Sequence, residues 1–176
     1  MIRQLLVGVA ILMVGIAVGY KVALPTGAGG YRQEVDSTIS RQRSQPPLVA
    51  RVEFRGIVTN NCRVAASIEL GFITFGVLGG CILLINGIEM GVMYRTALAA
   101  GLYWKLWLFH VIPHGIVEYV GFLLAEAVAV QGGRYLWAIL NGRTILIQRR
   151  IIVAALACYP IILLAALIEV YVTPFL

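Results

Sequence analysis

Charged side chains are scarce in this sequence. Asp, Glu, Lys and Arg make up 12% of the 176 residues, and His occurs twice, whereas about 25% of the residues in an average soluble domain are charged. Hydrophobic residues make up 60%, and the mean hydropathy is +0.90. These values exclude a water-soluble monomer and predict a protein whose principal solvent is the lipid bilayer.

Sequence patterns that carry catalysis are also missing. The chain contains no Gly-rich phosphate loop, no GxSxG elbow, and neither the HExxH nor the ExxH metal spacing. Its three cysteines, Cys62, Cys81 and Cys158, form no CxxC pair, so the sequence does not predict a disulfide framework. We therefore expect a protein that is not an enzyme and has no cofactor or bound metal.

The formal net charge of +6 does not indicate a nucleic-acid partner. The Arg residues fall between apolar runs and do not share one face with interleaved aromatic residues, as a nucleic-acid surface requires. They are typical of charges that orient a protein in a membrane, with anionic lipid headgroups as their counter-charges. Membrane lipids are thus the first expected partner.

The apolar runs predict an all-α, polytopic transmembrane bundle of about five spans, at roughly 20 residues for each crossing. Residues 1–24 are expected to form the first span, an uncleaved signal anchor. A cleaved signal peptide is the alternative, but no clear small-x-small site precedes Lys21. Residues 25–59 predict a polar, extracytoplasmic loop with a short interfacial helix, and residues 60–176 predict a membrane core of four spans.

Two features interrupt the central spans. Asn86-Gly87 predicts a tight turn between a span at 64–85 and a span that begins near Ile88. Only about 15 residues separate this turn from the aromatic and basic cluster at 103–107, which is short for a full crossing. Pro113 removes a backbone donor and kinks the fourth span. We therefore expect kinked or partly re-entrant central segments.

The distribution of Arg predicts the orientation. Residues 134–150, expected as an amphipathic linker on the membrane surface, contain four Arg and no acidic residue, whereas acidic residues accompany the basic ones in the loop 25–59. The positive-inside rule then places 134–150 in the cytoplasm and 25–59 outside. This assignment holds only if the third segment crosses the membrane.

The most informative segment places two imidazoles and a carboxylate four residues apart in an apolar run: His110, His114 and Glu118. Because Pro113 separates His110 from the helix that follows, His114 and Glu118 are the expected pair. Three interpretations remain open. They are a structural pair that locks the bundle, a pathway for a proton or solute, and a metal or haem site that includes His110.

Other charged residues also lie within or near the apolar runs. Arg95 with Glu89 or Glu69 is the simplest interhelical ion pair, because an unpaired charge in hydrocarbon is costly. For Glu89 and Glu126, exposure to headgroups is the favoured interpretation. Glycines predict close helix packing and self-association at two faces, Gly15 with Gly19 and Gly76 with Gly80.

Four pieces of the sequence, in order, resemble the stage II sporulation protein M (SpoIIM-like) family. They are Asn60-Asn61, Asn86-Gly87 with Gly91, PHGIVE at 113–118, and the closing segment 166–174. The resemblance runs from about residue 60 to 174, and the first span resembles the family in layout only. One departure is Glu126, in a stretch where the family usually continues with small residues.

The resemblance implies a prokaryotic cytoplasmic membrane protein of roughly five spans. The family's namesake anchors peptidoglycan-degrading partners during engulfment, and relatives are encoded with ATPases or with bacteriocin secretion and immunity functions. By analogy, a polar core is expected from five residues: His114, Glu118, Asn61, Asn86 and Glu169.

Two functional hypotheses follow. The first is a non-enzymatic membrane subunit that scaffolds a complex with other membrane proteins or with further copies of itself, the polar core fixing helix register. The second is a permease-like or channel-like subunit in which broken segments near Asn86 and Pro113 line a path for an ion, lipid or peptide.

Overall fold

The computed structural model describes residues 1–23, 47–99, 104–144 and 146–173, with backbone only for 47–52 and 104–110. These residues form helices and connecting turns, without a strand, so the predicted all-α class is confirmed. The helices are α1 (Ile2–Val22), α3 (Pro47–Leu70), α4 (Val77–Ala99), α5 (Trp104–Leu140) and α6 (Arg149–Tyr171), with a short 3-10 turn, η1 (Gly71–Thr74), between α3 and α4.

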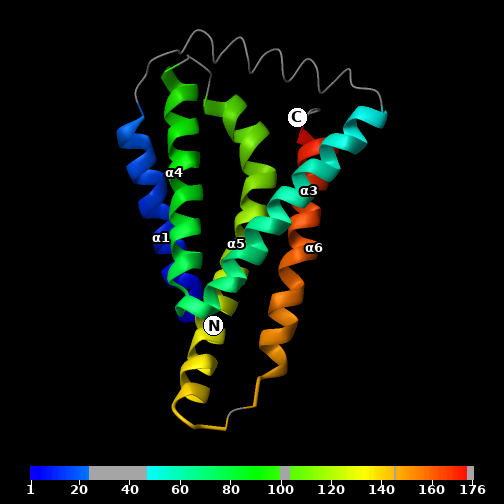
Figure 1. The fold of residues 1–176 in the computed structure, drawn as a ribbon. Helices are drawn as coiled ribbons and strands as arrows, with labels where there is room; N and C mark the ends of the chain where they lie inside the picture. The colour runs from blue at the N-terminus through cyan, green and yellow to red at the C-terminus, as the bar shows by residue number, and fades with distance from the viewer. Residues whose placement is uncertain (24–46, 100–103, 145, 174–176) are drawn as a thin grey trace.

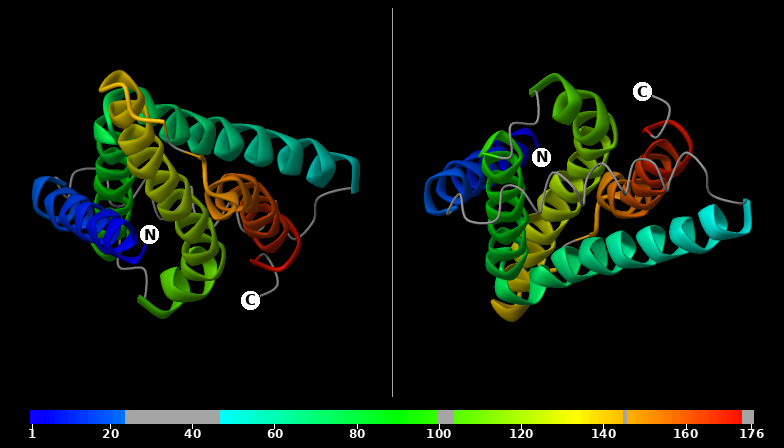
Figure 2. Two further views of the ribbon diagram at one scale, coloured as in Figure 1. Left: turned by 90° about the horizontal axis from the view of Figure 1, so that it is seen from below. Right: turned by 90° about the horizontal axis from the view of Figure 1, so that it is seen from above.

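Successive helices alternate in direction between the two ends of the bundle (Figure 1). α1 and α4 lie side by side and run the same way, α5 lies at the centre, and α3 crosses the bundle obliquely beside α6 (Figures 1 and 2). The start of α1, η1 and the residues 141–144 and 146–148 lie at one end, and the last turns of α1, α4 and α6 lie at the other (Figure 1).

Four of the described helical segments are long and apolar enough to cross a membrane: Ile2–Val22, Val77–Ala99, Val111–Leu140 and Arg149–Tyr171. α3 also runs from one end of the bundle to the other (Figure 1), but it carries five charged residues and is not among them. The predicted boundary at 59/60 lies inside α3, so residues 47–59 belong to a helix and not to the loop. The predicted helix at 34–42 lies outside the described residues.

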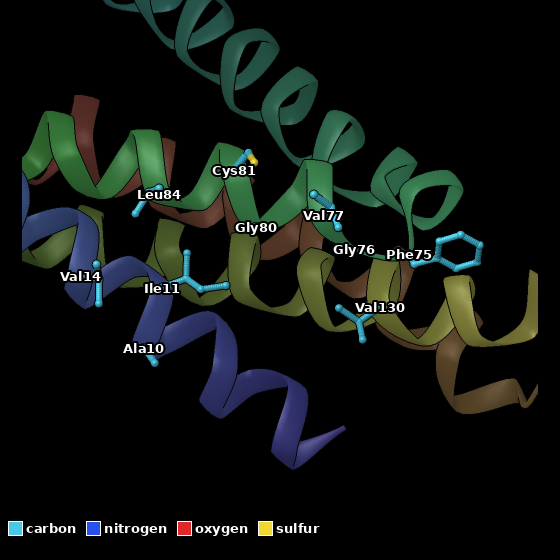
Figure 3. A pocket seen from close by; sticks show the side chains of 10 residues that line it. All are labelled: Ala10, Ile11, Val14, Phe75, Gly76, Val77, Gly80, Cys81, Leu84 and Val130. Carbon is cyan, nitrogen blue, oxygen red and sulfur yellow. The ribbon is translucent and has the colours of Figure 1, made fainter. Parts of the chain in front are cut away.

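The chain turns at residues 71–76, which corrects the predicted span at 64–85. Phe75 and Gly76 have φ values of 57° and 91°, a left-handed conformation that Gly adopts without strain. The Thr74 hydroxyl accepts a hydrogen bond from the Leu78 amide at 2.9 Å and so caps the start of α4. Figure 3 shows Phe75 and Gly76 ahead of this helix.

No turn occurs at Asn86-Gly87, which lies inside α4, so the predicted break there is wrong. The Asn86 side chain donates to the Ile82 carbonyl of the same helix at 2.9 Å and is therefore compatible with helical backbone. The predicted third span is the second half of α4, a helix of 23 residues that needs no re-entrant path.

α5 also differs from the prediction at both ends. It continues through Pro113, and the helix changes direction near its start (Figure 1). It extends past Gly132 and Gly133 to Leu140, so residues 134–140 are the end of a helix and not a surface linker. The two glycines allow η1 to approach α5 closely, since a Cβ atom at Gly133 would lie 2.6 Å from the Phe75 Cα.

Glycines form the contact between α1 and α4. Gly8, Gly15 and Gly19 in α1 have the same spacing as three glycines in α4, each 72 positions later: Gly80, Gly87 and Gly91. A Cβ atom at Gly15 would lie 2.5 Å from the Leu84 carbonyl oxygen and 3.0 Å from the Gly87 Cα. The two backbones are thus nearly in contact, as small residues allow in lipid.

This contact places the predicted glycine faces inside the chain. Gly19 packs against Ile88 of α4, and Gly80 lies beside Ile11 of α1. These faces are therefore occupied by the neighbouring helix of the same chain, which corrects the expectation that they join separate copies.

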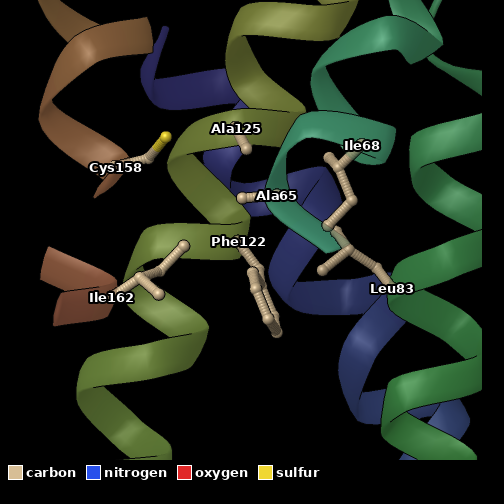
Figure 4. Packing of buried hydrophobic residues seen from close by; sticks show 7 residues of the cluster. All are labelled: Ala65, Ile68, Leu83, Phe122, Ala125, Cys158 and Ile162. Carbon is tan, nitrogen blue, oxygen red and sulfur yellow. The ribbon is translucent and has the colours of Figure 1, made fainter. Parts of the chain in front are cut away.

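The buried core lies where the other helices meet. Ala65 and Ile68 of α3, Leu83 of α4 and Phe122 of α5 are fully buried, together with Ala125, Cys158 and Ile162. Figure 4 shows Phe122 between side chains of α3, α4 and α6. Because helix contacts in lipid depend on van der Waals packing, this cluster holds α3 and α5 against α4, and α6 against α3 and α5.

Gly87→Ala is expected to lower the free energy of unfolding by about 1–3 kcal/mol, because the added methyl group overpacks two backbones. The matched control is Gly56→Ala in α3, where a Cβ atom would meet nothing within 4 Å. This control should be neutral or stabilising by roughly 0.5–1 kcal/mol. Equilibrium unfolding in mixed micelles measures both, and equal effects of the two substitutions would contradict the α1–α4 contact.

Candidate functional site

The residues of the predicted polar core occur on four helices. His114 and Glu118 lie on α5, Glu169 on α6, Asn61 on α3 and Asn86 on α4. His114 contacts α6, where its Nδ1 lies 3.5 Å from the Thr173 hydroxyl oxygen. The Thr173 hydroxyl also lies within hydrogen-bond distance of the Ile168 carbonyl, at 3.1 Å, so Thr173 links His114 to the last turn of α6.

Carboxylates from three helices approach one another near the same end of the bundle. Glu118 interacts electrostatically with Glu169, and Glu169 interacts with Glu53 of α3. The predicted partners of His114 and Glu118 were each other, but their contacts run between helices, to Thr173 and to Glu169. The prediction thus located two of the helices that meet here, and it missed Thr173 and Glu53.

Asn86 and Asn61 contribute to packing in different ways. Tyr119 of α5 donates to the Asn86 carbonyl oxygen at 3.2 Å and so joins α5 to α4. Tyr119 also interacts electrostatically with Glu118 and Glu89, which connects Asn86 with the carboxylate group. Asn61 is 7% exposed and accepts a hydrogen bond from the neighbouring Asn60 at 3.1 Å.

Glu69 joins α3 to α6. Its Oε2 accepts a hydrogen bond from the Tyr159 hydroxyl at 2.9 Å, and its Oε1 accepts one from the Cys158 thiol at 3.4 Å. The partners of this carboxylate are therefore neutral donors and not Arg95. The polar α3 is held against the apolar α6 through this carboxylate, at about the middle of α6.

Arg95 pairs with an aromatic residue. Its Nη1 donates to the Tyr20 hydroxyl oxygen at 3.2 Å, and its guanidinium carbon lies 5.1 Å from the centre of the Tyr20 ring. The expected ion pair with Glu89 or Glu69 is thus replaced by a cation–π contact between the last turns of α1 and α4.

Glu126 is the principal residue that the sequence analysis placed wrongly. Its side chain is 3% exposed, so it does not face headgroups. The carboxylate lies against Gly76, Gly79 and Gly80 at the turn before α4 and its first residues, and its Oε2 contacts Gly79. Those glycines were predicted as a packing face, and the space that their missing side chains leave is the signal that would have identified Glu126 as buried.

An apolar groove of about 560 Å³ adjoins this carboxylate. Side chains of α1, α4 and α5 line it (Figure 3). Gly76 and Gly80 form part of its wall, and the Glu126 Oε1 lies 3.4 Å and 3.8 Å from their Cβ positions.

The metal or haem interpretation depends on His110, whose side chain lies outside the described part of the chain, as does the aromatic cluster at 103–107. Among the described residues, no three His, Cys, Asp or Glu side chains are grouped so as to hold a metal ion. The described polar groups therefore form interhelical contacts and one isolated buried carboxylate.

The sequence profile of the family described as Stage II sporulation protein M matches residues 8–174. The chain belongs to this SpoIIM family. The match confirms the resemblance and extends it through α1, which the sequence analysis compared with the family in layout only. Together with the four apolar helices, it identifies an integral membrane protein. No curated protein and no solved structure matches the chain.

Tyr159→Phe is expected to lower the free energy of unfolding by about 1–3 kcal/mol, because it leaves a partly buried oxygen of Glu69 without its donor. Tyr171→Phe is the matched control. The Tyr171 ring packs on Phe54 with the ring centres 6.0 Å apart. Because Tyr171→Phe preserves this ring contact, the free energy of unfolding should change by no more than about 0.5 kcal/mol. Thermal unfolding in detergent measures both, and a loss for Tyr159→Phe no larger than for the control would exclude the α3–α6 bond as a stabilising contact.

Proposed function

We propose that this SpoIIM-family protein is a non-enzymatic membrane subunit that anchors or scaffolds a complex in a prokaryotic cytoplasmic membrane. The observation that carries the proposal is the small share of each span that the chain itself covers. Between 22% and 33% of the most apolar stretch of each span is buried within the chain. Most residues of these stretches therefore keep some side-chain surface that lipid or the helices of partner proteins can contact.

The interhelical contacts support the same function. Glu69 with Tyr159, His114 with Thr173, and Arg95 with Tyr20 each join two helices. Such bonds fix the rotation and register of helices in lipid, where apolar surfaces alone distinguish poorly between alternative packings. A bundle held in this way presents a constant outer surface, which is what an anchor requires. Further copies of this chain or other membrane proteins are the proposed partners.

A permease-like function is the second candidate, and one observation favours it. Glu118, Glu169 and Glu53 come from three helices and interact although they carry the same charge. Facing carboxylates within a membrane bundle are typical of proton or ion pathways, whereas a purely structural contact usually joins unlike groups. The transported species would be an ion, lipid or peptide, with an ATPase as a possible partner.

Reconstitution separates the two functions. For the scaffold we expect proteoliposomes that hold the protein to show no proton or alkali-ion flux above protein-free vesicles. We also expect His114→Ala to lower the amount of complex recovered in mild detergent, because the contact between α5 and α6 is lost. Flux that Glu118→Gln abolishes, in a variant that melts like the wild type, would replace the scaffold with the permease.

A further inference from the structure

Two buried oxygen atoms in the described part of the chain have no hydrogen-bond donor. They are Oε1 of Gln4 and Oε2 of Glu126, and the two side chains are 8% and 3% exposed. A buried polar atom without a partner is costly. Two such atoms in one region therefore indicate that a group with the complementary chemistry binds there.

Both side chains lie where α1, α4 and α5 meet. Gly8, one turn after Gln4, has its Cβ position 3.9 Å from the Glu126 Cγ. The Gln4 amide nitrogen donates to the Gln131 Oε1 of α5 at 3.3 Å, so Gln4 contacts α5 five residues beyond Glu126. The α1–α4 register of 72 positions also brings Gln4 level with Gly76, beside which the Glu126 Oε1 lies.

The chemistry of the two oxygens specifies the missing group. An amide oxygen and a carboxylate oxygen are both acceptors, so the group between them must be a donor or a cation. A carboxylate in hydrocarbon also needs its charge neutralised. The start of α4 carries a partial positive charge from the helix dipole. This charge stabilises the ionised Glu126 carboxylate after the cation has left.

The charged residues on the surrounding helices do not supply this group. Arg3 of α1 and Arg134 of α5 are exposed, and Glu69 of α3 accepts from Tyr159 and Cys158. Glu89 of α4 interacts with Tyr119 and, as a carboxylate, adds no cation. No hydrogen-bond donor among the described residues therefore reaches the Glu126 Oε2.

We propose that Gln4 and Glu126 form a binding site for one small cation, either a proton or a sodium-sized ion, at the junction of α1, α4 and α5. A proton on the Glu126 carboxyl group would be donated to the Gln4 Oε1, and a sodium-sized ion would be coordinated by oxygens of both side chains, the hard ligands such ions prefer. The site is separate from the Glu118–Glu169 group and does not depend on which complex the protein anchors.

The apolar groove of Figure 3 gives a probe access to this carboxyl group, because Gly76 and Gly80 belong to both. Dicyclohexylcarbodiimide is apolar and reacts with protonated carboxyl groups. The carboxyl O–H adds across a C=N bond of the carbodiimide, and the product rearranges to a stable N-acylurea. The experiment treats the full chain in phosphatidylcholine nanodiscs and locates the adduct by peptide mass spectrometry.

We expect an adduct on Glu126 whose yield falls as the pH rises. If sodium lowers the yield at constant pH, the bound cation is a sodium-sized ion, and if sodium has no effect, it is a proton. Without sodium, Gln4→Leu should lower the yield several-fold, because the acceptor for the carboxyl proton is lost. The absence of any Glu126 adduct from mildly acidic to mildly alkaline pH would overturn the proposal, as would a wild-type yield in Gln4→Leu.

Melting temperatures in the same nanodiscs give a second readout that does not depend on labelling. Glu126→Gln supplies its own N–H donor, so this variant should melt at least as high as the wild type and should lose any dependence of melting on pH and sodium. If Glu126→Gln melts below the wild type in every condition, the wild-type site lacks no donor and the proposal is wrong.

Discussion

The bundle depends on the close parallel contact of α1 and α4. Water drives apolar surfaces together in soluble proteins, but lipid offers no such force, so helices associate through backbone approach, packing and hydrogen bonds. Gly15 and Gly19 in α1 and Gly87 and Gly91 in α4 allow this approach, and the Gly15–Gly87 pair brings the two backbones into contact. The paired helices then form one wall, against which α5 packs and through which α3 and α6 are positioned.

The positions of the polar side chains also depend on how closely the helices pack. Because the glycines remove side chains along α4, a carboxylate fits where a larger residue would otherwise lie, and Glu126 occupies that space. At the opposite end the helices diverge (Figure 1), and polar side chains from α3, α5 and α6 meet there. The bundle therefore has two polar regions. One holds several interacting groups, and the other holds one carboxylate and one amide.

The sequence predicts the class of this fold better than its boundaries. Composition alone indicates a helical membrane bundle, because few other structures satisfy backbone hydrogen bonds in lipid. The turn was expected at Asn86-Gly87 because that dipeptide favours turns in water, but in α4 the same glycine is required for contact with α1. The actual turn depends on the positive φ of Phe75 and Gly76, and an apolar run with glycines on both sides of the turn gives little sign of its position.

The residues of the candidate site were also predicted better than their contacts. Spacing along α5 identified His114 and Glu118 as polar residues in an apolar run, but spacing within one helix does not reveal partners on another, such as Thr173 or Glu169. The repeated glycine spacing in α1 and α4 is visible in the sequence. This spacing would allow the close approach of the two helices to be predicted. The burial of Glu126 becomes predictable only after that approach is known, since it depends on three glycines from the turn and the start of α4.

Cysteine cross-linking between α1 and α4 in native membranes tests the central claim most directly. The Tyr20 and Tyr94 rings pack together with their centres 5.9 Å apart, so Tyr20→Cys with Tyr94→Cys, after replacement of Cys62, Cys81 and Cys158 by Ser, should be joined by a short bifunctional thiol reagent. The parallel register predicts no cross-link between Tyr20→Cys and Leu78→Cys, at the other end of α4. A cross-link to residue 78 and none to residue 94 would contradict the account.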